Sequence, residues 1–490
     1  MRHLKRRLGS ALLLTWVSAC LMGHVAAEEE EFELLSDQSE GILELQGETR
    51  LRIDAIRGHI SLRRSAEGEM RFAAVREENR REEMPILLWV RDRELVLAPP
   101  EDAADERYYL EITIPAELAT FVDTTDSTLS SAGLAGDLSL IGKQSRTHVR
   151  GQQGALTIEQ EGGTLDVDQV ALESDLRLAD VRGRIQRLDG PLDLVAREST
   201  IELIDANNTV SLELEQTKLV ASRLQSRGEI HATGGTVDIR ECSRGFSIEL
   251  DETPLTLTDI GGPVEVDTNA SVRFHNLTAR LRVHGYGAPV YGKGARFGVD
   301  VETTEAEVTL EDLGGNSSVR GSSLRLTIDG VKAQNLTIET NYSSIEAKNI
   351  DAELTISNDF GDISIKGAVK PVTVMSRGGS VRAHDLSGAV KIEGEGELFE
   401  AVWLKAPADG QNVIINESGD VRVALATDSG MKIAAETEYG EVVSSLPGLE
   451  MSGDNKSATG NVGGSRGTST LQAKAVGSVY IDGIAVVGGN

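Results

Sequence analysis

The clearest pattern in the chain is an apolar position that returns every 18 residues. Two such series run half a period apart, and a weaker third accompanies them. Their members are Leu336, Leu354, Val372 and Val390; Ile345, Ile363 and Val381; and Ile350, Ala368 and Leu386. Apolar and polar residues alternate around these positions, which is the two-residue period of half-buried strands. The pattern predicts two clear short strands and a third inward position in each repeat.

The same register extends upstream of these repeats. Apolar residues follow in nine-residue half-steps from Val237 to Val264 and from Val290 to Val308, and helical spacing is nearly absent. A strand pair of this kind cannot bury its inner face alone, so successive repeats must stack on one another. The predicted fold is therefore all-β, a single-stranded parallel β-helix or β-solenoid with coils of about 18 residues.

The periodicity divides the chain into five parts. Residues 1–27 are the candidate export signal, and residues 115–448 carry the solenoid repeats. Residues 28–114 are less periodic and predict an irregular β region that caps the solenoid. Residues 449–470 are rich in Gly and Ser and predict a loop, and residues 471–490 return to the strand pattern. The strand candidates of the N-terminal part are 49–54, 58–63, 70–75, 86–90, 94–98 and 108–114.

Residues 1–27 have the features of a secretory signal peptide. A basic start is followed by the apolar stretch Ala11–Met22 and by small residues that predict cleavage after Ala27. The apolar stretch is too short for a membrane span, which needs about 20 residues. A second possibility is lipidation, because Val17 to Cys20 resemble a lipoprotein box. The protein is predicted to be exported to the periplasm or cell surface, with an outer-membrane anchor if Cys20 is lipidated.

Charge and cysteine content narrow the choice of partners. The chain has 78 acidic and 49 basic residues, and its formal net charge is −29 at pH 7. Such an acidic surface disfavours nucleic acid and anionic lipid as partners. After cleavage at Ala27 the only cysteine is Cys242, so no intramolecular disulfide is predicted. A small buried side chain is the simpler interpretation of Cys242, and a reactive thiol is the alternative.

Many predicted strands begin with a Gly followed by Asp or Ser. Examples are Gly361-Asp362 and Gly379-Ser380, which lie 18 residues apart. Gly permits a positive φ at a sharp corner, and a following Asp or Ser can bond to the backbone of the turn. A phosphate-binding loop would open a helix, and no helical pattern follows these residues. The Gly residues are therefore interpreted as corners of the solenoid.

These features together resemble a family of exported bacterial proteins described as adhesins, the DUF4097-like or head GIN-like domains of unknown function. The resemblance is carried by LRIDAIRGHISLRR, YYLEITIPAELA, the serial Gly-Asp or Gly-Ser corners, and a Gly/Ser-rich loop before GSVYID. It covers nearly the whole exported chain, although the central corners often have ES, ET or TN in place of GD. The resemblance implies a right-handed β-helix at the cell envelope, and it brings no catalytic residues with it.

Catalytic and metal-binding patterns are not recognisable in the sequence. The histidines are scattered without metal-ligand spacing, and no cofactor is predicted. Carboxylates are abundant, but rows of acidic and basic residues on a solenoid are usually solvated surface. The enzymatic alternative is a polysaccharide lyase or glycosidase, since such reactions also occur on β-helices. Even coils without long insertions, and few aromatic residues, argue against it.

One Gly-rich segment, residues 282–298, is unusual in this acidic chain. Basic and aromatic side chains occur together there and form a candidate ligand-contact patch, which consists of His284, Tyr286, Tyr291, Lys293, Arg296 and Phe297. Such a mixture suits an acidic glycan or a loop of a partner protein. The alternative is a Gly-rich loop whose long side chains merely reach into solvent. Both interpretations stay open at this point.

The sequence thus favours a non-enzymatic exported solenoid that acts as an adhesin or as a scaffold of the cell envelope. The expected partners are a glycan or an envelope protein, with no nucleic acid and no transmembrane span. Self-association by end-to-end stacking is a further possibility, which the acidic start EEEEFE disfavours. The alternative remains a carbohydrate-active β-helix enzyme.

Overall fold

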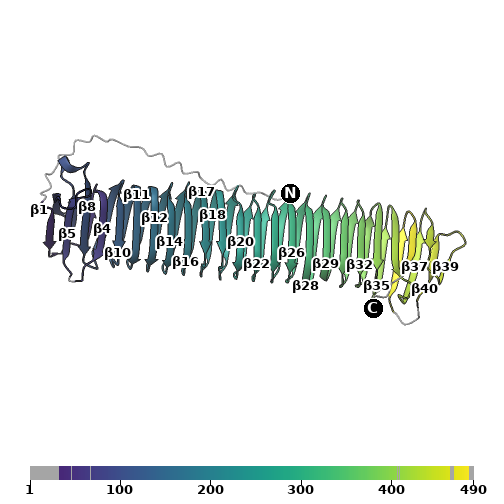
Figure 1. Cartoon of the computed structure of the whole chain (residues 1–490). Helices are drawn as coiled ribbons and strands as arrows, with labels where there is room; N and C mark the ends of the chain where they lie inside the picture. The colour runs from purple at the N-terminus through teal and green to yellow at the C-terminus, as the bar shows by residue number, and fades with distance from the viewer. Residues whose placement is uncertain are drawn as a thin grey trace.

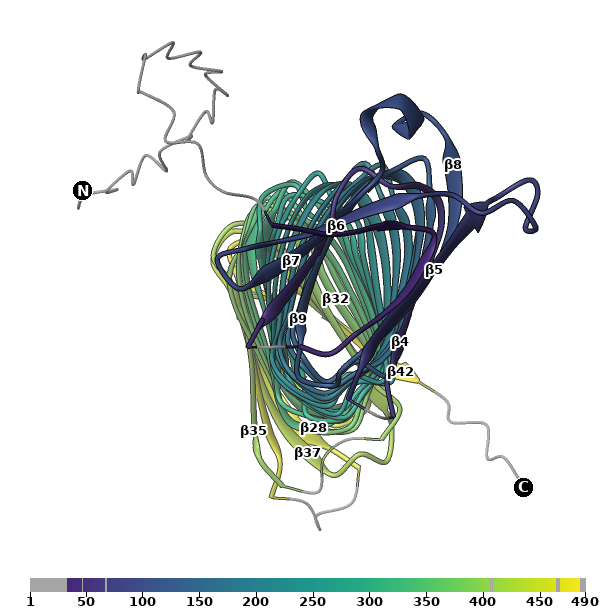
Figure 2. The same cartoon turned by 90° about the vertical axis from the view of Figure 1, so that its left-hand side faces the viewer.

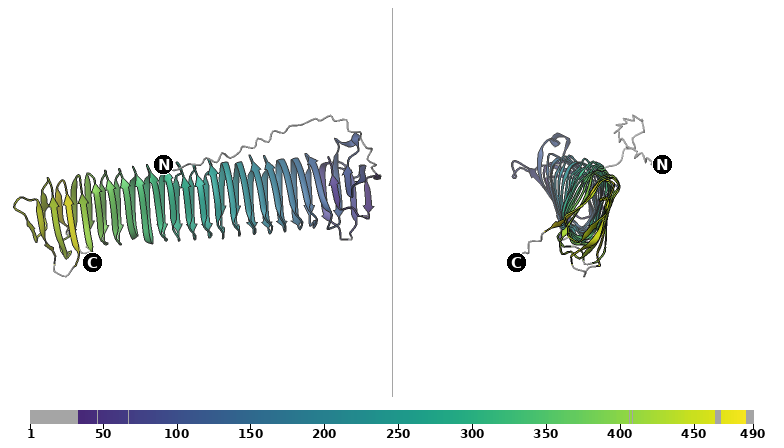
Figure 3. Two further views of the ribbon diagram at one scale, coloured as in Figure 1. Left: turned by 180° about the vertical axis from the view of Figure 1, so that it is seen from behind. Right: turned by 90° about the vertical axis from the view of Figure 1, so that its right-hand side faces the viewer.

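The chain forms a long rod of stacked β-coils. The computed structural model describes residues 33–484 apart from 46, 67, 406, 408 and 464–467, and it describes no side chains for 33–37. The candidate signal 1–27, including Cys20, lies outside the described residues. Strands make up 68% of the structure, arranged as a parallel β-solenoid of about 17 turns with coils of roughly 18 residues. Figure 1 and Figure 3 show the rod from two opposite sides.

Each coil contributes one strand to each of two faces of the rod. The first face contains β9 (Ala119–Thr125), β13 (Ser174–Ala179), β15 (Leu192–Arg197), β19 (Phe246–Asp251), β21 (Val264–Thr268), β23 (Leu281–Gly285), β25 (Val299–Thr304), β27 (Ser317–Ser322), β31 (Val372–Arg377), β33 (Val390–Glu395) and β35 (Gln411–Asn416). The second face contains β10 (Thr128–Ala132), β14 (Arg182–Leu188), β16 (Thr200–Ala206), β20 (Leu255–Ile260), β22 (Val272–Leu277), β24 (Val290–Ala295), β26 (Glu307–Leu313), β30 (Ile363–Ala368), β32 (Val381–Leu386), β34 (Leu398–Trp403) and β36 (Asp420–Ala426).

Six longer strands bend around a corner and contribute to both faces. They are β11 (Leu138–Gln152), β12 (Leu156–Val170), β17 (Val210–Ser222), β18 (Gly228–Arg240), β28 (Arg325–Asn341) and β29 (Ser344–Asp359). All neighbouring strands between β9 and β36 pair in parallel. Figure 2 looks along the rod and shows the coils superimposed around a common interior.

The 18-residue register predicted from the sequence is confirmed. Leu354 of β29 pairs with Val372 of β31, and Val372 pairs with Val390 of β33. On the second face Ile345 pairs with Ile363, and all these side chains are buried. Stacking of identical positions brings apolar side chains into continuous interior rows. Each fully buried Leu, Ile or Val stabilises the fold by about 1.5–3 kcal/mol relative to its exposed state.

The Gly corners have a structural role. Gly361 has a φ of +147°, and a Cβ atom at this position would lie 2.1 Å from the carbonyl oxygen of Ser343 in the preceding coil. No other residue fits this close approach of two coils. The Oδ1 atom of Asp362 accepts a hydrogen bond of 2.9 Å from the backbone N–H of Ser380. The Gly-Asp pair therefore joins one coil to the next, and its interpretation as a corner is correct.

The N-terminal end is covered by antiparallel strands, and all six strand candidates there are strands. The strands are β1 (Glu33–Gln38), β2 (Glu40–Leu43), β3 (Arg50–Ile53), β4 (Arg57–Arg64), β5 (Met70–Arg76), β6 (Ile86–Arg91), β7 (Glu94–Ala98) and β8 (Arg107–Ile114), with the short 3-10 helix η1 (Glu101–Ala103). β1, β6 and β7 are antiparallel neighbours, as are β2, β5 and β8. This arrangement occupies the strand edges that the first parallel coil would otherwise expose.

The order of the coils in space differs from their order in the chain at both ends. β3 lies between β7 and β9, and β4 lies between β8 and β10. At the other end β41 (Thr470–Ala475) lies between β35 and β37 (Met431–Thr437). β42 (Val479–Ile484) lies between β36 and β38 (Val442–Ser444). The last described coil is thus inserted between two earlier ones, and β39 lies nearest the tip in Figure 1.

The prediction of a loop at residues 449–470 is wrong in part. The segment contains β39 (Leu449–Met451) and β40 (Ser457–Val462), which pair antiparallel with each other, and β40 also pairs antiparallel with β37. Small residues are common in loops, but here they also permit close packing, since a Cβ at Gly460 would lie 2.0 Å from the carbonyl oxygen of Gly448. The hairpin therefore covers the C-terminal end of the rod.

Cys242 is buried as predicted, with 1% of its surface exposed. Burial raises the pKa of its thiol to about 11, so almost none of the reactive thiolate is present at pH 8. We predict that a thiol-specific disulfide reagent does not modify Cys242 in the native protein and modifies it fully after denaturation. Rapid modification of the native protein at pH 8 would show instead that this side chain is accessible.

Candidate ligand-binding groove

A groove runs along the first face, parallel to the axis of the rod. It consists of three hollows of about 460, 760 and 600 Å³. Ala155, Thr157 and Glu173 line both the first and second hollows, whereas Arg227, Gly228 and Ser247 line both the second and third. The axial groove therefore extends from β3 to β23, which is on the order of 50 Å at the usual spacing of strands.

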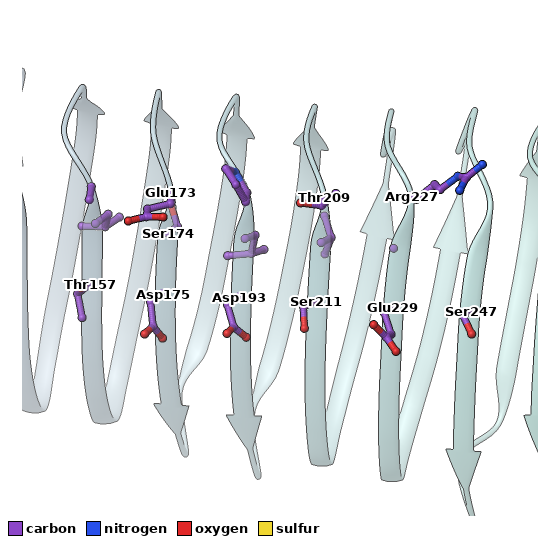
Figure 4. A pocket seen from close by; sticks show the side chains of 16 residues that line it. Thr157, Glu173, Ser174, Asp175, Asp193, Thr209, Ser211, Arg227, Glu229 and Ser247 are labelled. Atoms are coloured by element: carbon purple, nitrogen blue, oxygen red, sulfur yellow. The ribbon is translucent and has the colours of Figure 1, made fainter.

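The groove exists because one row of outward-facing residues has short side chains. Its members pair in register from strand to strand, and Figure 4 shows its central part as a straight row. The row consists of Ser139, Thr157, Asp175, Asp193, Ser211, Glu229 and Ser247. The next outward row along the same strands carries longer side chains, among them Arg177, Glu213 and His231. These longer side chains form one wall of the groove.

The corner that precedes the first-face strands forms the other wall. Here the stacked residues include Pro191, Thr209 and Gly245, which are small or rigid. At Gly245 a Cβ atom would lie 2.0 Å from the carbonyl oxygen of Pro263, so only Gly fits this contact between coils. The concave shape is therefore a result of stacking and of side-chain length in two adjacent rows, and it requires no loop insertion.

The central part of the groove is acidic and rich in hydroxyl groups. Asp175 forms an ion pair of 3.0 Å with Arg177, and Glu229 lies 3.3 Å from His231. No side-chain partner is recorded for Asp193 or Glu173 within the described part of the chain, and both are exposed. Carboxylates accept hydrogen bonds, whereas hydroxyl groups both donate and accept them. The row thus presents polar groups at the regular spacing of the coils.

The end of the groove near β23 has the opposite charge. Arg227, Arg244, Arg280 and Arg282 line the third hollow together with Gly261, Gly262 and Pro263, and Glu265 is the acidic residue among the described lining. Arg280 is held by Asp300 through two hydrogen bonds of 2.6 and 2.7 Å. Burial tends to raise the pKa of Asp300, but hydrogen bonds from Arg280 and Ser318 outweigh it, so the pKa lies below its usual value. We call this region the basic corner.

The six residues of the predicted contact patch do not form one surface. His284 lies on β23 of the first face, whereas Tyr291 and Lys293 lie on β24 of the second face. Tyr286 lies in the turn between these two strands, and Arg296 and Phe297 lie at the corner after β24. One coil surrounds the rod, so residues that are close in this sequence point in different directions. The structure brings together Tyr291 with Lys293, and Arg296 with Phe297, but not the whole set.

Most of these side chains are engaged by acidic neighbours from the next coil. Lys293 pairs with Glu311 at 3.2 Å and Asp312 at 3.4 Å, and hydrogen bonds from Lys293 to these carboxylates raise its pKa. Tyr291 donates a hydrogen bond of 3.0 Å to Glu307, which raises the pKa of the phenol. His284 lies 3.4 Å from Glu302. These three side chains are therefore part of the charge pattern between coils.

Arg296 and Phe297 are different, because they lie at the same edge of the rod as the basic corner. Phe297 is stacked in register with Gly315 of the next coil, as Gly262 is with Arg244. It is 55% exposed, and the Arg296 guanidinium lies 5.6 Å from the centre of its ring. This part of the predicted patch thus adjoins the basic corner, whose other arginines sequence reasoning missed. The signal was available, since Arg227 and Arg280 occupy the same corner in coils three repeats apart.

Metal chemistry and helical membrane insertion find no support in the described region. No group of three or more His, Cys, Asp or Glu side chains there could hold a metal ion. Over the same residues, no helix is both long and apolar enough to cross a bilayer. The groove therefore offers hydrogen-bonding and charged side chains as its chemistry.

Comparison with known proteins concerns mainly the C-terminal part of the rod. The family model described as Toastrack DUF4097 matches residues 298–475. This segment is a Toastrack domain. The resemblance found in the sequence is thereby confirmed for this segment, and Toastrack DUF4097 is a domain of unknown function. No curated protein and no solved structure matches the chain.

The matched segment and the axial groove occupy different parts of the molecule. The Toastrack domain begins at Gly298, whereas the groove ends at Arg282 of β23. The solenoid continues through this boundary without interruption, since β23 pairs in parallel with β25. The groove is therefore a feature of the coils that precede the Toastrack domain, and its role has to be inferred from its own residues.

Proposed function

We propose that the protein is exported and acts without catalysis as a rigid binding rod of the cell envelope, an adhesin or scaffold that holds an extended polysaccharide in the axial groove. The observation that carries this proposal is the continuity of the groove over the strands from β3 to β23. Export is proposed from the sequence of residues 1–27. A groove much longer than it is wide suits a linear polymer better than a compact ligand.

The lining of the groove favours a carbohydrate over a protein. Its exposed central row consists of Ser, Thr, Asp and Glu, and no aromatic side chain occurs in the described lining of the largest hollow. Protein interfaces depend on aromatic and other large apolar anchors at their centre. Hydroxyl and carboxylate groups at a regular spacing instead match the hydroxyl groups of a repeating sugar chain. The enzymatic alternative would use carboxylates of the same row.

Filling the groove should abolish binding without damage to the fold. Ser211 lies exposed in the middle of the central row, so Ser211→Trp places a large side chain in the path of the polymer. We predict that this variant of the exported form, residues 28–490, binds polysaccharides on an immobilised array at least about tenfold more weakly. Ser364→Trp is the matched control, because Ser364 is also exposed on a strand but lies on the second face.

Two results would contradict the proposal. Equal binding by the Ser211→Trp and Ser364→Trp variants would place the ligand outside the axial groove. Release of new reducing ends or unsaturated products from a polysaccharide by the unmodified protein would favour the lyase or glycosidase alternative. The same preparation serves both measurements, so binding and cleavage are compared directly.

A further inference from the structure

The basic corner stands out because charge compensation is the rule on the coils before it. There, arginines have an acidic partner from the same or a neighbouring strand. Examples are Arg184 with Glu202 at 3.7 Å, Arg197 with Glu215 at 3.1 Å, and Arg223 with Asp205 at 2.6 Å. Within the structurally described chain, Arg227 and Arg244 are exposed and have no recorded acidic partner. Two guanidinium groups therefore remain available in one hollow.

The surroundings of these two arginines leave their positive charge largely uncancelled. Asp300 lies 3.8 Å from Arg282 as well as contacting Arg280, so one carboxylate is shared by two guanidinium groups. Glu265 is the acidic residue in the described lining. Four arginines thus face two carboxylates, in a chain whose net charge is −29. An anion is repelled by most of this surface and attracted at the basic corner.

The shape of the hollow permits direct contact with the guanidinium groups. Its floor includes Gly245, Gly261 and Gly262, which have no side chains, and its volume is about 600 Å³. A Cβ atom at Gly262 would lie 2.0 Å from the carbonyl carbon of Arg244, so the stacking of coils requires Gly there. The arginines consequently rise above a bare floor. Guanidinium groups bind planar carboxylates and tetrahedral oxyanions through paired hydrogen bonds.

We propose that the basic corner is the anion subsite of the axial groove and takes carboxylate or sulfate groups of an acidic polysaccharide. This inference rests on the proposed function, because it assigns a substrate class to the same groove. The hollow is continuous with the central row through Arg227, Gly228 and Ser247. A sugar chain in the groove therefore passes its hydroxyl groups along the acidic row and its charged groups along the basic corner.

The test compares acidic and neutral forms of one polymer. Oligogalacturonate, its carboxyl-reduced form and a heparin oligosaccharide serve as the probes, and binding to the exported form is measured by calorimetry at several salt concentrations. We predict that Arg227→Ala with Arg244→Ala weakens binding of one of the two acidic probes on the order of 100-fold, and lowers its salt dependence. Binding of the carboxyl-reduced polymer should be unchanged. A preference for galacturonate or heparin distinguishes carboxylate from sulfate.

A second double variant with the same change in net charge is the control. Arg146 and Arg150 are both exposed on the second-face part of β11, so Arg146→Ala with Arg150→Ala should leave all binding unchanged. Equal loss in both double variants would overturn the subsite, since net charge alone would then explain the effect. Equal binding of the reduced and acidic polymers would also overturn it, while the proposed function would stand.

Two further results separate the subsite from the proposed function. If none of the three oligosaccharides binds, both proposals fail together. If polyglutamate binds as tightly as the acidic oligosaccharides and with the same dependence on Arg227 and Arg244, the corner recognises charge on a peptide, and the assignment to a polysaccharide is overturned. The circular dichroism spectrum of each variant shows whether its strands are intact.

Discussion

Deletion of residues 470–484 is expected to release the segment from 431 to 462 from the rod, while the coils before it stay folded. β41 and β42 are each paired on both sides, with β35 and β36 toward the centre and with β37 and β38 toward the tip. The tip therefore contacts the rest of the solenoid through this inserted coil. Limited proteolysis and hydrogen exchange should show loss of protection in 431–462 and full protection in 336–403.

A matched pair of substitutions and a rescue make this test specific. Ala473 is buried in β41 and Gln472 beside it is exposed, so Ala473→Asp should reproduce the loss of protection and Gln472→Asp should not. A synthetic peptide of residues 468–484 should restore protection to the deletion variant. Undiminished protection of 431–462 after the deletion would mean that β37 and β38 can pair directly with β35 and β36.

Replacement of Asn416 by Leu is expected to destabilise the neighbouring coils by about 3 kcal/mol. Asn416 is 1% exposed, and its amide lies at the corner after β35. Its Oδ1 atom accepts hydrogen bonds from the N–H groups of Gly396, Ser418 and Gly419, and its Nδ2 atom donates to the carbonyl groups of Gly396 and Asp420. Ser418 can still bond to Gly396, so the main cost falls on the groups of Gly419 and Asp420.

The effect can be measured with a local reporter. Trp403 is fully buried in β34 and donates a hydrogen bond of 3.3 Å to the carbonyl oxygen of Gly388. In the exported form with Trp89→Phe, the fluorescence of Trp403 reports unfolding of this region in denaturant. Asn461→Leu is the control, since Asn461 is exposed on β40 and surface changes usually alter stability by less than about 0.5 kcal/mol. Equal unfolding midpoints of the two variants would show that the buried amide is dispensable.

The architecture was predictable because stacking repeats the same environment every 18 residues. Leu354, Val372 and Val390 occupy one interior row, and each apolar residue in the sequence reports the same contact. The corners were predictable for a similar reason, since Gly361 and Gly379 meet the same steric limit in successive coils. Repetition thus converts a weak local signal into a strong one.

The order of coils at the ends was not predictable from the same pattern. A strand such as β41 alternates apolar and polar residues in the same way whether it pairs with the coil before it in sequence or with an earlier one. The choice depends on how the hairpin of β39 and β40 packs, and short Gly/Ser-rich segments give no periodic signal for that. The prediction of a loop at 449–470 failed for this reason.

The axial groove and the basic corner were missed because both depend on outward-facing residues. Apolar periodicity identifies the interior, whereas the groove follows from the shortness of side chains such as Asp193 and Ser211 on the outside. The patch predicted at 282–298 combined residues by their closeness in sequence, although a coil distributes them over both faces. Residues at multiples of 18, such as Arg227 and Arg280 with one residue lost between them, are the ones that share an edge.

The inserted coil also gives the two ends of the rod unequal resistance to pulling. A force on the chain near Glu33 first loads β1, which pairs with β6 alone. A force on the chain near Ile484 first loads β42, which is held by β36 and β38 at once. Removal of β42 must break two rows of hydrogen bonds, whereas β1 separates after one. A ligand-loaded rod under tension would therefore hold more firmly at its C-terminal tip and yield first at its N-terminal cap.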